Sequence, residues 1–357
     1  MNNFEPSAAA SARPDAAASA VRTESRALYA ALTSAVVGGV LGLVLGLTRP
    51  LPLVGEWSFG NLAAIAAGLL GAAAAATGYA LARRSPGQEW RREVPSPLTI
   101  VSFSGVVIVH GLLASLTTLA TFLLLGRGFI GLILDPFWSV LLMGTTTGLT
   151  AWIITLSVSR LTTVRMSSLL MAFVGLGTLT SMVTASDPDW WRTHFSHLGT
   201  FGDLSSLLFN GTLIVGGLMV TAFAIYVSND MRPLVDAGQL RSRTSPRTVA
   251  RLFIVMGVML AGVGIVPVHV SLLIHNVCAS GMAVAFGALL ISGPRVLAGM
   301  PRAYFVASWL FLAAMLVSVA LFAMGFFGLT AFEILVFAMV FGWMAVFIRF
   351  LATARPD

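Results

Sequence analysis

The sequence predicts an all-α protein, a polytopic integral membrane helix bundle with about ten transmembrane helices. Hydrophobic residues make up 57% of the chain, charged residues only 10%, and the mean hydropathy is +0.91. Soluble domains carry about 25% charged residues, so this chain lacks the polar surface to cover itself in water. Apolar runs of about 18 residues or more recur along it, which is the length that crosses a bilayer. The arginines also separate between alternate connecting segments, as they do on the two sides of a membrane.

The elements begin with a tail over residues 1–25, whose Ala- and Ser-rich composition and mixed charges predict disorder. Because the first apolar run is a full span, no cleaved signal peptide is expected. Each of the following ten runs is long enough to cross about 30 Å at about 1.5 Å per residue. They lie near residues 28–48, 61–82, 99–126, 130–158, 166–184, 205–228, 250–267, 273–292, 304–325 and 331–353.

The first four spans form a four-helix block over residues 26–165. The first span carries Gly38, Gly42 and Gly46, and glycines at this spacing predict close packing of two helix backbones. The fourth span is expected to begin at Pro136, because proline favours the first turn of a helix. His110, in the third span, is the one ionisable side chain near the middle of a span. A single histidine is not a proton relay, which argues against a proton-driven pump.

Spans five to ten form a six-helix core over residues 166–353, so the expected arrangement is 4 + 6. All 21 basic residues are arginine. Eighteen of them fall in the segments that share a side with the N-terminus, and only Arg49, Arg127 and Arg192 fall on the other side. Cytoplasmic loops are the arginine-rich ones. Both termini are therefore expected in the cytoplasm, and the protein in the cytoplasmic membrane of a bacterial cell.

Composition also excludes several kinds of chemistry. Without lysine the chain has no P-loop for ATP and no amine for a Schiff base. Its one cysteine, Cys278, excludes an internal disulfide and a cysteine-based metal cluster. No nucleic-acid-binding module is present, so the expected partner is membrane lipid and not nucleic acid.

Polar residues gather in the stretch SDPDWWRTHFSHLGTFGD, residues 186–203, between spans five and six. The arginine distribution makes this loop extracytoplasmic. The turn between spans seven and eight, on the same side, adds two histidines, and Asn210 lies one turn inside span six. The candidate ligand-binding residues are Ser196, Asn210, His275, His194, His197, His269 and Asp203. We expect the loop to fold back over the bundle, so that Ser196, Asn210 and His275 line one shallow pocket.

Three interpretations of these residues remain open. They hold a phosphate or sugar head group by hydrogen bonds, or the histidines bind Zn²⁺ or another divalent ion that activates a water, or they only cap helix ends and fasten the loop. The spacing His-x2-His differs from the His-Glu-x-x-His of zinc proteases. No cofactor is expected, and a divalent metal at the outer histidines is the alternative.

The second half of the chain resembles the membrane-protein family catalogued as domain of unknown function 998. That family has a Ser-x-Leu-Gly turn followed by a Phe-Asn pair entering the next helix, matched here by Ser196, Leu198, Gly199, Phe209 and Asn210. Its later Pro…His element is matched by Pro267 and His275. The resemblance covers about 166–353 and implies six helices, but the family has no assigned activity. A more distant resemblance is to Frag/DRAM/Sfk-type six-helix proteins, some of which are linked to lipid-anchor remodelling or lipid distribution.

The function that these observations favour is a membrane protein whose extracytoplasmic pocket binds or modifies a lipid head group or another small polar ligand. The alternatives are a small-solute permease and a non-catalytic assembly partner. A permease needs a polar path across the bilayer, whereas these polar residues lie on one side. Catalysis is not indicated by the sequence, and an enzyme of this kind would be a lipid-directed hydrolase or transferase.

Overall fold

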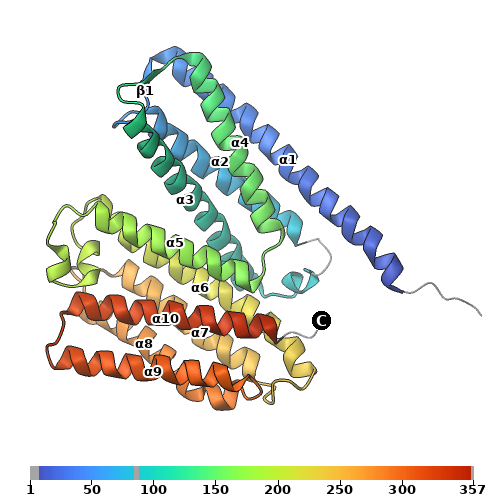
Figure 1. Ribbon diagram of the computed structural model, residues 1–357, viewed down its shortest axis with the longest axis vertical. Helices are drawn as coiled ribbons and strands as arrows, with labels where there is room; N and C mark the ends of the chain where they lie inside the picture. Colours follow the sequence, from blue (N-terminus) through green and yellow to red (C-terminus); the bar gives the residue numbers. More distant parts are fainter. Residues whose placement is uncertain (1–7, 84–87, 355–357) are drawn as a thin grey trace, which may run out of the picture. The chain divides into compact units, whose positions relative to one another are not determined.

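The computed structural model describes residues 8–83 and 88–354. These residues form ten α-helices, three short 3-10 helices and a two-stranded antiparallel sheet (Figure 1). Each α-helix contains a segment long and apolar enough to cross a membrane, which confirms an all-α multi-pass membrane protein. The α-helices are α1 (Ala8–Thr48), α2 (Phe59–Ala82), α3 (Ser96–Gly128), α4 (Pro136–Ser159), α5 (Thr163–Val183), α6 (Leu204–Asp236), α7 (Ser245–Ile265), α8 (Leu272–Val296), α9 (Arg302–Ala323) and α10 (Leu329–Thr353). The shorter elements are β1 (Leu51–Pro52), η1 (Glu89–Arg92), β2 (Ile133–Leu134), η2 (Trp190–Arg192) and η3 (Phe195–Gly199).

Polar side chains fix where many of these helices begin. The helix α4 starts at Pro136, as predicted, and the side chain of Asp135 accepts a hydrogen bond from the N–H of Trp138 at 2.9 Å. Ser58, Thr162, Asp203 and Ser271 cap α2, α5, α6 and α8 in the same way. Each cap satisfies a backbone donor that the first turn of a helix leaves without a partner.

The start of α1 differs from the prediction. The helix begins at Ala8, inside the stretch 1–25 that the sequence predicts to be disordered. Alanine has the highest helix propensity, and residues 8–10 and 16–18 are all alanine. The serine and charged residues between them therefore do not prevent a helix. Residues 1–7 of the predicted tail, together with Arg84 and Arg355 of the arginine count, lie outside the described residues.

The chain divides into two compact units. The first contains residues 1–93 and 106–161, and the second contains residues 94–105 and 162–357. The predicted boundary lies near residue 165. The structure differs from it because residues 94–105, which include the beginning of α3, belong to the second unit. Gly105 lies against α6, where an added Cβ would be 3.4 Å from the sulfur of Met219. That the first four spans can be separated from the rest remains a prediction.

In the first unit, α1 packs along α4 through the three predicted glycines. An added Cβ would lie 2.1 Å from Thr147 Oγ1 at Gly38, 2.3 Å from the Ser139 carbonyl at Gly42, and 2.8 Å from Pro136 Cα at Gly46. Such short distances leave no room for a side chain, so the prediction of close backbone packing is confirmed. Thr147 also donates a hydrogen bond to the Ser34 carbonyl of α1 at 2.8 Å. At one end of the unit β1 pairs with β2, with Leu51 opposite Leu134, over a buried cluster that includes Phe59 and Phe122.

In the second unit, α6 is the central helix, because it packs against both α5 and α7. The approach of α6 to α7 is close at Gly217, where an added Cβ would lie 2.4 Å from the Gly257 carbonyl. Trp343 of α10 is fully buried, stacks on Phe347 and donates a hydrogen bond to Ser308 of α9 at 3.0 Å. This aromatic core fastens α10 and α9 to the rest of the unit.

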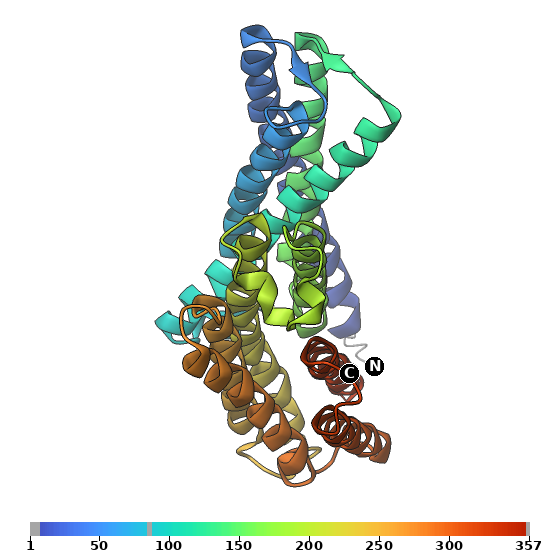
Figure 2. The same cartoon turned by 90° about the vertical axis from the view of Figure 1, so that its left-hand side faces the viewer.

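One end of the second unit carries the loop between α5 and α6, the turn between α7 and α8, and the turn between α9 and α10. Figure 2 looks onto this end, with the yellow-green α5–α6 loop in front. We call it the loop end. It contains all seven candidate ligand-binding residues.

Candidate functional site

The α5–α6 loop folds into two short 3-10 helices before α6 begins. Gly202 has a φ of +67°, a backbone conformation that favours glycine, and it allows the chain to turn sharply before Asp203. Asp203 then caps α6, with Oδ1 accepting from the Ser206 N–H at 3.0 Å and Oδ2 from the Ser186 N–H at 3.3 Å. Slight burial works in the opposite direction, but the hydrogen bonds from Ser186 and Ser206 lower the pKa of the Asp203 carboxyl.

Glu333, in the first turn and a half of α10, holds this loop in place. Its carboxylate accepts hydrogen bonds from the Phe195 N–H at 2.5 Å and from the Ser196 hydroxyl at 3.3 Å. Phe195 is buried edge-on against Phe209 of α6 and Phe337 of α10. One charged acceptor and one aromatic anchor therefore fasten η3 to the six-helix unit.

His194 extends this hydrogen-bonded group. Its Nδ1 lies 3.1 Å from Ser196 Oγ, and Ser196 is buried. Because the Ser196 proton goes to Glu333, the Ser196 oxygen accepts from His194 Nδ1–H. Partial burial, and then the neighbouring charges of His197 and His275, lower the pKa of His194 from its ordinary value of 6.5.

His275 lies near His194 and belongs to the first turn of α8. It is buried, and its Nδ1 donates to the Val266 carbonyl at the end of α7, at 2.9 Å. We call His194, Ser196, His275 and Glu333 the loop-end cluster.

Asn210 has a structural contact that explains its place in α6. Its amide donates a hydrogen bond to the Gly199 carbonyl at 2.9 Å, and an added Cβ on Gly199 would lie 2.4 Å from Asn210 Oδ1. Asn210 therefore faces the loop and ties down the end of η3, as expected for an amide that must find a partner in a membrane. That Asn210, Ser196 and His275 line one pocket remains a prediction.

The other two candidate histidines differ in their surroundings. The ring of His197 packs edge-on against His194 and Phe201, and its Nε2 lies 3.8 Å from Asp187 Oδ2. His269 is exposed on the turn between α7 and α8, and none of the hydrogen bonds found among residues 88–354 involves its side chain. The structure thus brings His197 to the cluster and leaves His269 at the surface.

Aromatic and charged residues surround the cluster. Trp190 packs beside Phe195, whereas Trp191 is 53% exposed, as an interfacial anchor would be. The guanidinium of Arg192 lies over the Trp191 ring and pairs with Asp189 at 3.1 Å. This arginine is therefore already engaged by an acidic neighbour.

Glu333 is the one residue of the loop-end cluster that was not among the candidates chosen from the sequence. The sequence does indicate a role for Glu333, because it is the one acidic residue between Asp236 and Asp357. An acidic residue within an apolar span indicates that it has a polar partner. Its partners lie 137 and 138 residues earlier in the chain, and no local pattern predicts such a distant pairing.

Two further observations concern metal binding and the buried histidine of the first unit. Among the described residues, no group of three or more His, Cys, Asp or Glu side chains is arranged to hold a metal ion. His110, in the first unit, is buried with Nδ1 2.8 Å from the Val106 carbonyl and Nε2 3.0 Å from Ser157 Oγ, so both ring nitrogens have partners.

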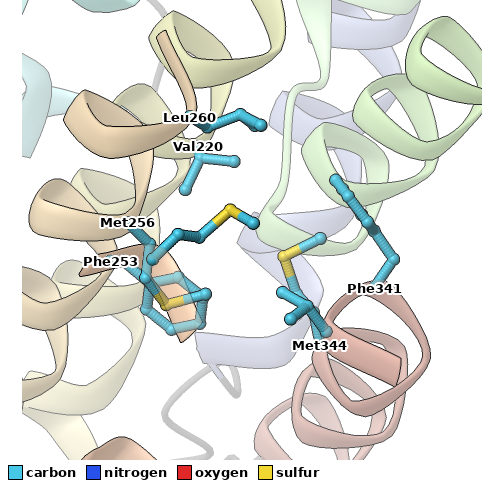
Figure 3. Close-up of a pocket in the computed structure, with 8 residues that line it drawn as sticks. Val220, Phe253, Met256, Leu260, Phe341 and Met344 are labelled. Carbon is cyan, nitrogen blue, oxygen red and sulfur yellow. The ribbon is translucent and has the colours of Figure 1, made fainter. Parts of the chain in front are cut away.

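The interior of the second unit contains a very small cavity, with a volume of only about 10 Å³. Its lining includes Phe253, Met256, Leu260, Phe341 and Met344, and Figure 3 shows that the side chains drawn carry only carbon and sulfur. The space between α6, α7, α8 and α10 is therefore apolar.

Ten membrane-crossing helices with polar side chains collected at one end define a multi-pass membrane protein. The family described as "Protein of unknown function (DUF998)" matches residues 168–349, which is just over half of the 357 residues. The chain belongs to this family, and the match confirms the resemblance predicted for about 166–353. Neither the curated proteins nor the solved structures give a match to this chain.

Proposed function

We propose that this protein binds the polar head group of a membrane lipid at its loop end, on the extracytoplasmic side of the cytoplasmic membrane. The observation that carries the proposal is the loop-end cluster. Three elements that are distant in sequence contribute to it: the α5–α6 loop, α8 and α10. Buried polar groups in a bilayer are expensive, and they commonly mark a functional site.

The charge balance favours one kind of head group. Asp187, Asp189 and Asp203 belong to the α5–α6 loop, and Glu333 accepts hydrogen bonds from it. The one arginine of the loop, Arg192, is paired with Asp189. The lowered pKa of His194 keeps its imidazole neutral at neutral pH. Such a site attracts hydroxyl or ammonium donors more than a bare phosphate, so a sugar or ethanolamine head group fits it best.

The geometry favours binding over hydrolysis. In a serine hydrolase the histidine lies between the serine and the carboxylate and takes the serine proton. Here the serine lies in the middle, and Ser196 gives its proton to Glu333. Ser196 is therefore a fastening residue for the loop in this arrangement, and a lipid-directed hydrolase or transferase is the less favoured alternative.

The permease alternative is disfavoured by the core of the second unit. A transporter of polar solutes needs polar groups along its path. The cavity at the centre of this unit is lined by side chains such as Val220, Phe253 and Met256.

The experiment is a lipid-binding measurement on the full chain in nanodiscs, with phosphatidylethanolamine, a glycolipid and phosphatidylglycerol as probes. His275→Asn keeps a donor near the position of Nδ1 for the Val266 carbonyl but removes Nε2. His269→Asn is the matched control, because His269 is exposed and outside the cluster. Loss of one hydrogen bond to a charged donor weakens binding about tenfold or more. We expect this loss for His275→Asn with phosphatidylethanolamine, a smaller loss with the glycolipid because its hydroxyl donors are uncharged, and no loss for His269→Asn. Equal binding by both variants would overturn the proposal.

A further inference from the structure

A second cavity lies in the first unit, between the beginning of the membrane-crossing part of α1 and the ends of α2 and α4. Residues 23–30 of α1 form one wall, residues 77–82 of α2 form the other, and Thr155 and Ser159 of α4 form the floor. The empty volume is about 650 Å³, counting the part open to the surroundings.

The packing of the helices explains this space. Both α1 and α2 pack against α4 and touch each other little. Gly148 of α4 packs closely against Ala31 and Ala35 of α1. Gly78 of α2 packs closely against Val158, near the end of α4. The two outer helices are thus held mainly by α4, and a groove lies between them at residues 23–30 and 77–82.

The groove has a defined chemical character. Arg26 is the one charged side chain among its lining residues. Thr77, Thr155 and Ser159 donate their hydroxyl protons to carbonyls of their own helices, at 2.9, 2.7 and 2.6 Å. Their oxygens can therefore only accept from a ligand. The groove thus offers one guanidinium for an anion and several acceptors for donors attached to that anion.

The surroundings of the groove are apolar. Leu28 and Leu32 of α1 are 56% and 55% exposed, and Leu81 at the end of α2 is 40% exposed. All three helices are of membrane-crossing length, and the groove lies at their ends. At that depth a bilayer presents phosphate groups with acyl chains attached, and basic pockets between transmembrane helices bind such head groups.

We propose that this groove binds one phospholipid, with the phosphate held by Arg26. A guanidinium matches two phosphate oxygens with parallel hydrogen bonds. The hydroxyls of a glycerol head group, or the ammonium of ethanolamine, donate to Thr77, Thr155 and Ser159. The acyl chains continue along the exposed apolar residues of α1. This site gives the first unit a role of its own, independent of the loop end.

The test is a titration of the purified full chain with phosphatidylglycerol, followed by native mass spectrometry to obtain the affinity for the first lipid bound. Arg26→Gln removes the charge from the groove. Arg22→Gln is the matched control, since Arg22 lies one turn earlier on the same helix and does not line the groove. We expect about a tenfold loss of affinity for Arg26→Gln and less than about a twofold change for Arg22→Gln, which alters only the general attraction to anionic lipid.

A second variant and a second ligand complete the test. Ala30→Phe fills the groove without changing the charge, and it should also reduce the affinity for phosphatidylglycerol. If Arg26→Gln fails to fold, Ala30→Phe carries the test. Inorganic phosphate and glycerol phosphate should not stabilise the protein against heat. Equal lipid affinities for Arg26→Gln and Arg22→Gln, or stabilisation by inorganic phosphate that depends on Arg26, would overturn the assignment of a phospholipid site.

Discussion

Glu333 has an unusual position for an acidic residue, because it lies within an apolar helix and accepts two hydrogen bonds from a loop far away in sequence. A hydrogen bond to a charged group contributes about 1.5–3 kcal/mol. The side chain of Glu333 therefore stabilises the conformation of the α5–α6 loop strongly. An exposed ion pair, such as that of Arg192 with Asp189, contributes less free energy.

Glu333→Gln should loosen the loop while leaving the helices intact. Glutamine has nearly the same shape, but it lacks the negative charge that strengthens the bonds to Phe195 and Ser196. A loss of about 1.4 kcal/mol corresponds to about tenfold faster amide exchange where the loop opens locally. Hydrogen exchange over residues 190–200 measures it.

The control for this prediction is Asp189→Asn, which breaks an exposed pair worth at most about 1 kcal/mol. Its exchange rates over residues 195–200 should stay close to those of the unchanged protein. Unchanged exchange in Glu333→Gln as well would mean that packing of Phe195 alone holds the loop.

His194 predicts a pH dependence of stability. Its pKa in the folded protein is below 6.5, so between that lower pKa and 6.5 the unfolded chain binds a proton that the folded protein does not. Stability therefore falls as the pH drops through this window and is constant above it. Asp203 acts in a lower window, because its lowered pKa contributes stability that is lost only as the pH falls below 3.8.

Thermal unfolding between pH 5 and pH 8 tests this effect of His194. The variant His194→Asn keeps a polar partner for Ser196 but cannot be protonated, so its melting temperature should decrease less on acidification. His269→Gln serves for comparison and should follow the unchanged protein. A parallel decrease in all three proteins would assign the pH dependence to other groups.

At the scale of helices, glycine decides how closely two elements pack. On α6, Gly217 lies against the backbone of α7, whereas Gly211 has open space where a side chain would be. The two positions are on the same helix and differ mainly in this surrounding space, which makes them a matched pair.

Gly217→Ala should destabilise the protein by about 1–3 kcal/mol, because the new Cβ would lie 2.4 Å from the Gly257 carbonyl and force α6 and α7 apart. Gly211→Ala should be neutral or stabilise by up to about 1 kcal/mol, since alanine favours the helix and meets no neighbour. Reversible unfolding in mixed detergent micelles compares the two. Similar losses in both variants would contradict the close approach of α6 and α7.

At the scale of the whole molecule, the distribution of arginine determines the expected orientation. The ten predicted spans assign 18 of the 21 arginines to the side of the N-terminus, and cytoplasmic loops carry such an excess. With an even number of spans, the C-terminus is expected on the same side. The loop end is then expected to face away from the cytoplasm, which the proposed function requires.

Reporter fusions at residues 90 and 240 measure this orientation. Both positions lie on the arginine-rich side, so a reporter active only in the cytoplasm should be active at each. A fusion at residue 190, in the α5–α6 loop, should be inactive with the same reporter. Activity on the opposite side at residue 90 or 240 would reverse the topology and place the loop end in the cytoplasm.

The sequence by itself determined the class of protein, the ten spans and several of their ends. The length of the apolar runs and the helix start at Pro136 depend on neighbours within a turn or a span. These are local relations, which a sequence displays. The glycines of α1 were predicted for the same reason, because their spacing repeats along one helix face. That the seven candidate residues bind a ligand remains a prediction.

Only the tertiary structure decided which polar groups meet. Glu333 accepts a hydrogen bond from Phe195, which lies 138 residues earlier in the chain, and Asn210 donates to the Gly199 carbonyl. His269 is exposed although it is close in sequence to the buried His275. The groove beside Arg26 likewise arises from how α1 and α2 pack on α4. Such partners are selected by the packing of whole helices, and a helix pattern records which face is apolar but not which distant side chain that face will meet.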